Sequence, residues 1–251
     1  MKEVDRINRF LRKVDEGAST SVRPFAAGVG YFNSKLPHVY DRNFLLITSD
    51  TDRAAVARAA EKLQGGAGLA HRKVVFEHEG SGERVAPALG DDGWEHRRLA
   101  IMVFRGWPDE AAAREAGEVD RRALLPALDE LIRSEPWGGD EEVVRQLSSA
   151  DMAIARAVEQ RCFARLVDGR VVASCRLYSD GEIAQIEDVA TLPGYRQRGY
   201  ARAAVARATR EAAPRHGLVF LTAVDGRWVK RWYERLGFEP IGLRYEATRP
   251  A

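Results

Sequence analysis

Short apolar runs alternate with amphipathic stretches along most of this chain, and that alternation restricts it to folds that mix strands with helices. The pattern is clearest in the C-terminal half, where strand-like runs at 170–178, 183–191 and 218–224 are separated by turn residues or by helical spacing. No run approaches the roughly 18 apolar residues needed to cross a bilayer, and the first residues lack the apolar core of a secretory signal. We therefore expect an α/β or α+β protein of the cytoplasm, without a membrane span.

The charge balance argues against a dedicated nucleic-acid binder, because the net charge is only +2. Residues 151–251 carry 17 basic and 12 acidic residues, whereas residues 1–150 carry 22 and 25. A basic excess in the C-terminal half is compatible with an anionic ligand there, and equally with an ordinary solvated surface.

Cysteine and histidine offer little chemistry. Cys162 and Cys175 lie among apolar residues in strand-like segments and are predicted to be reduced core residues. His71 and His78 have glutamates nearby but no second pair of ligands at metal spacing, so we expect no metal site.

The N-terminal half alternates helix and strand but contains no motif that carries chemistry. Helical spacing predicts a helix over 4–14, and a second helix over 53–63 that Asp52 can cap. Strands are expected at 44–48, 73–76 and 99–104.

A change of composition between Trp107 and Trp137 marks the best domain boundary. It includes a predicted helix over 121–132 and a break at Pro136-Trp137-Gly138-Gly139, after which Asp140 opens a helical stretch that continues to Val158. We therefore divide the chain into an N-terminal α/β region (1–108), a helical connector (109–139) and a C-terminal domain (140–251).

The C-terminal domain is expected to begin with a hairpin. Strands at 162–167 and 170–178 flank Asp168-Gly169, a favoured two-residue turn. A third strand follows at 183–191. The remaining predicted elements are a helix over 196–213, a strand over 218–224, a helix over 228–236 and a strand over 238–246.

The segment Arg196-Gln197-Arg198-Gly199-Tyr200-Ala201 stands where the third strand of this domain passes through a short loop into a helix. The first turn of a helix presents unpaired backbone N–H groups and the positive end of the helix dipole, which together bind phosphate well. Small residues at 199 and 201 allow close approach of an anion, and Arg196, Arg198 and Arg202 add positive charge.

This segment resembles the coenzyme A motif of the GNAT superfamily of N-acetyltransferases, which requires Gln or Arg, then Gly three residues later, then Gly or Ala two residues after that. Arg196, Gly199 and Ala201 satisfy it. The preceding Val189 to Arg196 looks like the family's fourth strand and its loop, and Trp232-Tyr233-Glu234-Arg235-Leu236-Gly237-Phe238 looks like the family's closing signature. The resemblance covers about residues 140–250.

The resemblance implies a mixed, mostly antiparallel central sheet flanked by helices, in which acetyl-CoA serves as co-substrate. It places the cofactor against one strand end and one helix start: Val189, Ala190, Thr191, Arg196, Gln197, Arg198, Gly199, Tyr200, Ala201 and Arg202. Asp225 departs from the family, where many members have Asn eight residues before the tyrosine, which puts one cofactor contact in doubt.

Catalysis would be direct transfer of the acetyl group to an amine. Glu187 and Asp188 are the candidate bases; strand alternation puts Glu187 on one face with Val189 and Thr191, so Glu187 is preferred, although both carboxylates could instead be solvated or paired with arginine. Backbone N–H groups at 189–191 would polarise the thioester carbonyl. Tyr233 would protonate the departing thiolate, unless it is only a packing residue.

The function predicted from the sequence is N-acetylation of a small molecule, amino acid or peptide, without nucleic acid, membrane or metal, and with a homodimer possible. The alternative is a catalytically silent acyl-CoA sensor. A further hypothesis gives the N-terminal half a regulatory or gating role, as a degenerate copy of the same fold.

Overall fold

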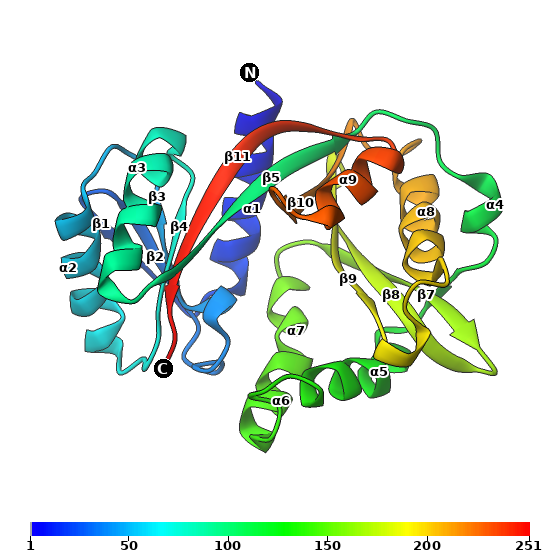
Figure 1. Cartoon of the computed structure of the whole chain (residues 1–251), viewed down its shortest axis with the longest axis horizontal. Coiled ribbons are helices and arrows are strands. Elements are labelled where there is room, and N and C mark those ends of the chain that lie inside the picture. The colour runs from blue at the N-terminus through cyan, green and yellow to red at the C-terminus, as the bar shows by residue number, and fades with distance from the viewer. Residues whose placement is uncertain (1) are drawn as a thin grey trace. The chain divides into compact units, whose positions relative to one another are not determined.

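The computed structural model describes residues 2–251 (Figure 1). The α-helices are α1 (Glu3–Ala18), α2 (Arg53–Leu63), α3 (Glu79–Leu89), α4 (Glu110–Ala113), α5 (Arg121–Arg133), α6 (Glu141–Ser149), α7 (Asp151–Ile154), α8 (Tyr200–Ala212) and α9 (Trp228–Arg235). The strands are β1 (Ser21–Phe25), β2 (Gly28–Phe32), β3 (Phe44–Ile47), β4 (Arg72–Phe76), β5 (Glu95–Phe104), β6 (Gly117–Val119), β7 (Glu159–Val167), β8 (Arg170–Ser179), β9 (Ile183–Thr191), β10 (Leu218–Val224) and β11 (Phe238–Arg249). Within residues 2–251, no helix combines the length and apolar character needed to span a membrane.

The chain forms two compact units. The first comprises Met1–Ile101, Ala223–Arg227 and Gly242–Ala251, and the second comprises Met102–Thr222 and Trp228–Ile241. Strands β5 and β11 therefore each begin in one unit and end in the other. The segment predicted as a helical connector, 109–139, supplies α4, β6 and α5 to the second unit.

The first unit has the strand order β1-β2-β3-β4-β11-β5. The first three strands are antiparallel, β4 runs parallel to β3, and β11 runs antiparallel to β4. Helices α2 and α3 supply Val56 and Val85 to a core that includes Phe76 of β4 and Trp94. Burial of this apolar cluster is what holds the two helices against the sheet.

The second unit has the strand order β11-β5-β10-β9-β8-β7-β6. Strands β7, β8 and β9 form an antiparallel meander, and β10 runs parallel to β9. Helix α5 packs on the face that carries Cys162, while helix α8 receives a hydrogen bond from Cys175 Sγ at Ala204 O on the opposite face. The two helices therefore cover opposite faces of the meander.

The same order of elements occurs twice in the chain. Three antiparallel strands are followed by a helix, a parallel strand, a second helix and a long strand, first as β1-β2-β3-α2-β4-α3-β5 and again as β7-β8-β9-α8-β10-α9-β11. The motif Arg196-Gln197-Arg198-Gly199-Tyr200-Ala201 lies in the second of these two series.

The predicted fold class, a mixed and mostly antiparallel sheet flanked by helices, is confirmed. The strands at 183–191 and 218–224 and the cap of α2 by Asp52 are confirmed to the residue. Two predictions were wrong in extent. The helix from Asp140 ends at Ser149 and gives way to the short α7, so Val158 lies outside both, and α8 begins at Tyr200 rather than at 196.

Candidate functional site

A cleft begins where β9 and β10 part. Their parallel register pairs only Ile183–Gln185 with Leu218–Phe220. Beyond it, β9 has a bulge: Glu187 lies opposite Arg176 of β8, but Ala190 lies opposite Ser174, so β9 has one residue more than its partner over this stretch. The β10-facing edge of β9 past the bulge thus has no strand against it within the described pairing.

The bulge is marked by an unusual backbone. Asp188 has φ +54, in the left-handed region that residues other than glycine rarely enter. Such a residue bends the strand locally and increases its twist. The edge formed by Val189, Ala190 and Thr191 is half-buried and borders the cleft.

The turn that leads into α8 forms the second wall. Gln197 and Gly199 both have positive φ, +62 and +80. Gly199 is the N-cap residue, and no side chain caps this described helix end. A Cβ at Gly199 would meet no atom within 4 Å, so glycine is required there for its backbone conformation and not for lack of space. Backbone N–H groups presented by such a turn form an anion-binding concavity.

The strand edge, the turn and helix α9 enclose a cavity of about 890 Å³. It is lined by Val189, Ala190, Thr191, Arg196, Gln197, Gly199, Tyr200, Ala201 and Arg202, together with Leu131, Tyr195, Trp228, Val229, Trp232 and Tyr233. Of the predicted cofactor residues, only Arg198 is not part of the lining; its guanidinium lies 5.6 Å from the centre of the Tyr195 ring. Sequence reasoning missed the α9 wall apart from Tyr233, although the spacing of Trp228, Val229 and Trp232 places them on one helix face.

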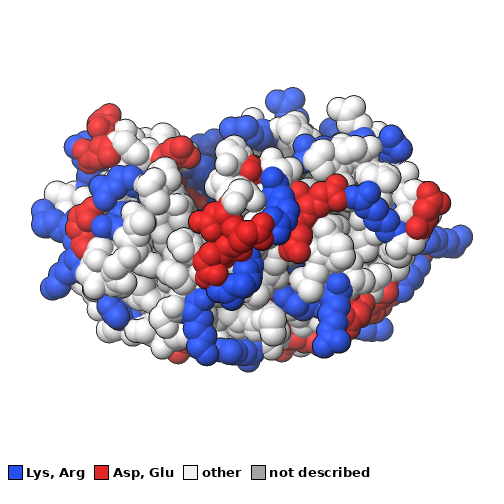
Figure 2. Space-filling model, turned by 90° about the horizontal axis from the view of Figure 1, so that it is seen from below, with Lys and Arg blue, Asp and Glu red and all other residues white. Residues whose placement is uncertain are grey.

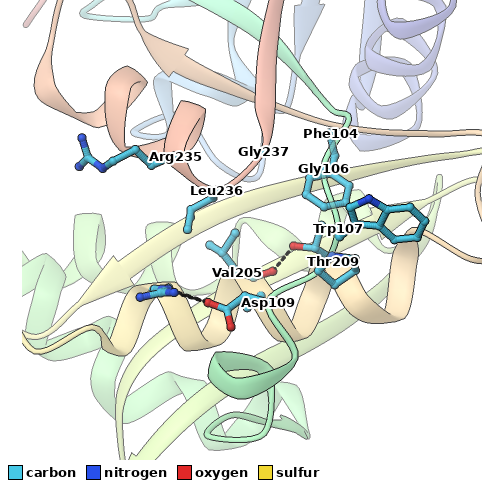
Figure 3. Close-up of a pocket in the computed structure, with 12 residues that line it drawn as sticks. Phe104, Gly106, Trp107, Asp109, Val205, Thr209, Arg235, Leu236 and Gly237 are labelled. Atoms are coloured by element: carbon cyan, nitrogen blue, oxygen red, sulfur yellow. Dashed lines mark hydrogen bonds and ion pairs between the residues drawn. The ribbon is translucent and has the colours of Figure 1, made fainter.

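The arginines around the cavity differ in their partners. Arg202 forms an ion pair with Asp109, with Nε 2.8 Å from Oδ2. Asp109 also caps α4 through the Ala112 N–H, and that hydrogen bond is the main cause of the lowered pKa of its carboxyl. Figure 3 shows a second pocket, which Asp109 and Arg202 line together with Phe104, Trp107 and Leu236. Arg196 Nε donates to Thr191 O at 3.3 Å. Part of the positive charge at this cavity is therefore balanced from within the unit.

Local charge balance is general in this chain. On the face drawn in Figure 2, basic and acidic side chains are interspersed. In the second unit, for example, Arg161 is paired with both Glu118 and Glu211. The basic residues of the second unit are therefore partly neutralised by ion pairs.

Tyr233 lies at the inner wall of the cavity and is only 6% exposed. Burial, with smaller contributions from the nearby Glu187 and Cys175, raises the pKa of its phenol well above the ordinary value. Its ring packs against Trp232 and Phe238, with centroids 4.8 and 5.8 Å away. The phenol is therefore protonated at neutral pH and is fixed by aromatic packing.

The two candidate carboxylates have different surroundings. Glu187 is half-buried and accepts a hydrogen bond from Gln185 Nε2 at 2.6 Å. The prediction that it shares a face with Val189 and Thr191 was wrong, because the bulge shifts the register and puts Glu187 on the same face as Ala190. Asp188 instead forms an ion pair with Arg176 at 2.6 Å.

The remaining polar candidates lie away from this cavity. Asp225 forms an ion pair with Arg98, and its N–H donates to Arg98 O at 2.8 Å, within the first unit. Cys162 and Cys175 are free and buried as predicted, and burial raises the pKa of both thiols. His71 is buried and stacked on Tyr40 at 3.8 Å. Residues 2–251 contain no group of three His, Cys, Asp or Glu side chains placed to hold a metal ion.

Comparison with protein families finds a match that lies mostly in the second unit. Residues 125–238 match the model of the acetyltransferase (GNAT) family, which confirms the resemblance inferred from the sequence. No curated protein matches the chain.

Solved structures share the fold over nearly the whole chain. A conserved protein of unknown function from Staphylococcus epidermidis aligns with a TM-score of 0.71 at 13% identity, covering 91% of this chain and 93% of its own. A GCN5-related N-acetyltransferase from Kribbella flavida aligns with a TM-score of 0.61 at 21% identity, covering 100% and 97%. A GCN5-related N-acetyltransferase-like protein from Streptococcus suis aligns with a TM-score of 0.53 at 15% identity, covering 99% of each chain. At these identities the likeness is one of fold.

Proposed function

We propose, on the premise that residues 125–238 form a domain of the GNAT acetyltransferase family, that this chain transfers an acetyl group from acetyl-CoA to a primary amine of a small molecule, amino acid or peptide. One observation carries the proposal: an uncapped helix start, an open strand edge and a buried tyrosine line the same cavity.

The cavity has the features that a coenzyme A thioester requires. The turn from Arg196 to Ala201, with two left-handed residues and no capping side chain, suits a diphosphate. The edge of β9 at 189–191 can hydrogen-bond the amide-containing arm of the carrier in the way a neighbouring strand would. The aromatic wall of α9 can cover the arm's apolar surface.

The thioester supplies an activated acyl group, and the residues of this chain position it. Backbone N–H groups beyond the bulge would bind the carbonyl oxygen and stabilise the negative charge that develops there during attack. An alkyl ammonium group has a pKa of about 10, so a base must first remove a proton from the acceptor. Glu187 is proposed for this role, because Asp188 is already bound to Arg176.

Tyr233 is proposed to protonate the departing thiolate. The phenol lines the cavity and carries its proton at neutral pH, and packing against Trp232 fixes the ring, so its hydroxyl is available as a donor when the C–S bond breaks. Loss of a general acid usually lowers the rate by about 10²- to 10⁴-fold.

The first unit is proposed to be a degenerate copy that gates or regulates the acceptor. Its topology repeats that of the second unit, but the start of α2 is capped by the Asp52 carboxylate, which accepts the Ala55 N–H at 2.7 Å. A carboxylate at this helix end takes the place that an anion would need and repels it.

The proposal is tested by following thiol release from acetyl-CoA against a panel of amines, with calorimetry of CoA binding in parallel. Tyr233→Phe should bind CoA as the wild type does, but turn over at least about 100-fold more slowly. Tyr31→Phe, a buried tyrosine of the first unit, is the matched control and should leave both measurements unchanged. Tight binding without turnover of any amine would favour a sensor instead, and absence of binding would refute both.

A further inference from the structure

A buried arginine binds the one carboxylate that sits at the bulge of β9. Arg176 of β8 is 6% exposed, and its Nη1 lies 2.6 Å from Asp188 Oδ2. The hydroxyl of Tyr178 donates to the same oxygen at 3.2 Å. Asp188, whose left-handed backbone creates the bulge, is therefore held by two donors from the neighbouring strand.

Both donors lie on the face of the meander that α5 covers. Arg176 stands opposite Cys162, which packs with Leu124 of α5, whereas Cys175 points to α8 on the other face. Tyr178 is two residues further along β8 and shares the face of Arg176. The Asp188 carboxylate is thus drawn to the α5 face.

Arg176 is itself fixed from a second side. Its Nε lies 3.3 Å from Asp151 Oδ2, an ion pair without good hydrogen-bond alignment. Asp151 is 5% exposed and also binds Arg121 of α5 through two short contacts and the Gln160 amide at 2.8 Å. Removing Asp188 would therefore leave Arg176 with a carboxylate partner, while removing Arg176 would leave Asp188 with only the Tyr178 hydroxyl among these donors.

The ion pair of Asp188 affects the cleft through the backbone conformation of Asp188. The residue after Asp188 begins the edge 189–191 that lines the cavity, so the φ of Asp188 sets the direction in which those N–H groups point. If the bulge relaxed to regular strand geometry, the register with β8 would shift by one residue and this edge would turn.

We infer that Arg176 and Tyr178 are positioning residues, which fix the bulge through the Asp188 carboxylate and thereby aim the backbone N–H groups of 189–191 at the acyl carbonyl. The inference rests on the proposed function for its catalytic meaning, but the fixing of the bulge can be measured without it. It also assigns Asp188 a structural part and excludes it as the base, which leaves Glu187.

The chain provides a matched control. Asp168 is also an aspartate with positive φ, +50, but it lies in the exposed turn between β7 and β8. Asp168→Ala imposes a similar backbone penalty away from the cleft, whereas Asp188→Ala imposes that penalty and also removes the acceptor for Arg176. Asp188→Asn tolerates the left-handed conformation and still offers an oxygen to both donors.

The experiment combines amide hydrogen exchange of the peptide 186–192 with CoA binding and steady-state kinetics. In Asp188→Ala and in Arg176→Met, exchange of this peptide should accelerate about tenfold or more, while the Kd for CoA changes less than about threefold. The kcat should fall about 10- to 100-fold, as when one oxyanion contact is misplaced. Asp188→Asn and Asp168→Ala should resemble the wild type in all three.

Two results would overturn the inference. In the first, Asp188→Ala changes the amide hydrogen exchange rate of peptide 186–192 no more than Asp168→Ala does. The other is faster exchange with an unchanged kcat. If even the wild type acetylates no amine, the proposed function fails, yet the exchange measurement still decides whether Arg176 fixes the bulge. If Arg176→Met does not fold, Asp188→Ala is sufficient for the test. The Asp188 side chain is 46% exposed, and its removal leaves Arg176 paired with Asp151.

Discussion

The ion pair between Asp109 and Arg202 leads to a prediction about affinity for the carrier. Arg202 lines the cavity, yet its guanidinium is engaged by Asp109. Asp109→Asn removes the competing charge and keeps the cap of α4, because asparagine caps helices as well as aspartate does. The freed guanidinium should then bind the diphosphate more favourably.

The size of the effect follows from exposure. The Arg202 side chain is 56% exposed and that of Asp109 is 27% exposed, so solvent screens the pair. Such pairs contribute about 0.5 to 1 kcal/mol, which corresponds to about two- to fivefold tighter binding of CoA. The gain should shrink as salt is raised, because exposed charges are screened.

The assay is calorimetry of CoA binding at low and moderate salt. Glu110→Gln is the control: it removes a negative charge from the same helix, but Glu110 pairs with Arg210 and not with Arg202. The gain should also vanish when Arg202→Gln is added to Asp109→Asn. Equal tightening by Glu110→Gln, or tightening that survives Arg202→Gln, would refute the reasoning.

Three further outcomes are expected. Gly199→Ala should weaken CoA binding about three- to tenfold, because alanine resists φ +80, whereas Gly194→Ala in the same loop should not; calorimetry compares them, and equal effects would contradict the backbone argument. The chain should bind one CoA and not two, since Asp52 caps the equivalent helix of the first unit; a calorimetric stoichiometry near two would show otherwise. Burial raises the pKa of Asp15 from 3.8 to about 6, so the folded state holds this proton more tightly, and the associated stability is present below about pH 4 and lost as pH rises through 6. Between pH 4 and 6, the free energy of unfolding measured with urea should therefore fall less in Asp15→Asn than in the wild type. If the free energy falls equally in both proteins, Asp15 is not the cause of the pH dependence.

Elements defined by local chemistry could be predicted from the sequence. The turn at Asp168-Gly169 forms as expected, with both residues at positive φ, and Asp52 caps α2. These features depend on residues within a few positions of one another, so the sequence contains their whole explanation. The helix α8 was also predicted, but its start at Tyr200 and the left-handed turn before it were not.

Elements defined by distant packing could not be predicted. Helix α3 contains Gly80, Gly82 and Pro87, which disfavour a helix. Gly82 is nonetheless required, because a Cβ there would lie 2.4 Å from the ring of Tyr245, which is 163 residues away in sequence on β11. The sequence did not predict the hairpin of β1 and β2 either. Glycine is required at position 28 of this hairpin because a Cβ there would lie 1.9 Å from Leu46 O on the neighbouring strand β3.

The left-handed residues connect the fold to the site. Within residues 2–251, the non-glycine residues with positive φ are Asp168, Asp188 and Gln197. Asp168 is explained by its tight turn, which joins two strands. Neither Asp188 nor Gln197 lies in such a hairpin. Asp188 lies within strand β9, and Gln197 lies in the turn before helix α8.

Unusual backbone conformations persist where the surrounding structure enforces them, and they concentrate at sites of function. Asp188 directly precedes the strand edge that borders the cavity, and Gln197 lies in the turn that lines the same cavity. If backbone conformation alone is needed at these two positions, replacing each residue by glycine, which adopts positive φ freely, should leave binding and activity unchanged. If the Asp188 carboxylate is needed to hold the bulge, Asp188→Gly should lower kcat even though glycine accepts its backbone, whereas Gln197→Gly should leave kcat intact. A wild-type kcat in Asp188→Gly would show that conformation suffices and that Arg176 contributes nothing beyond it.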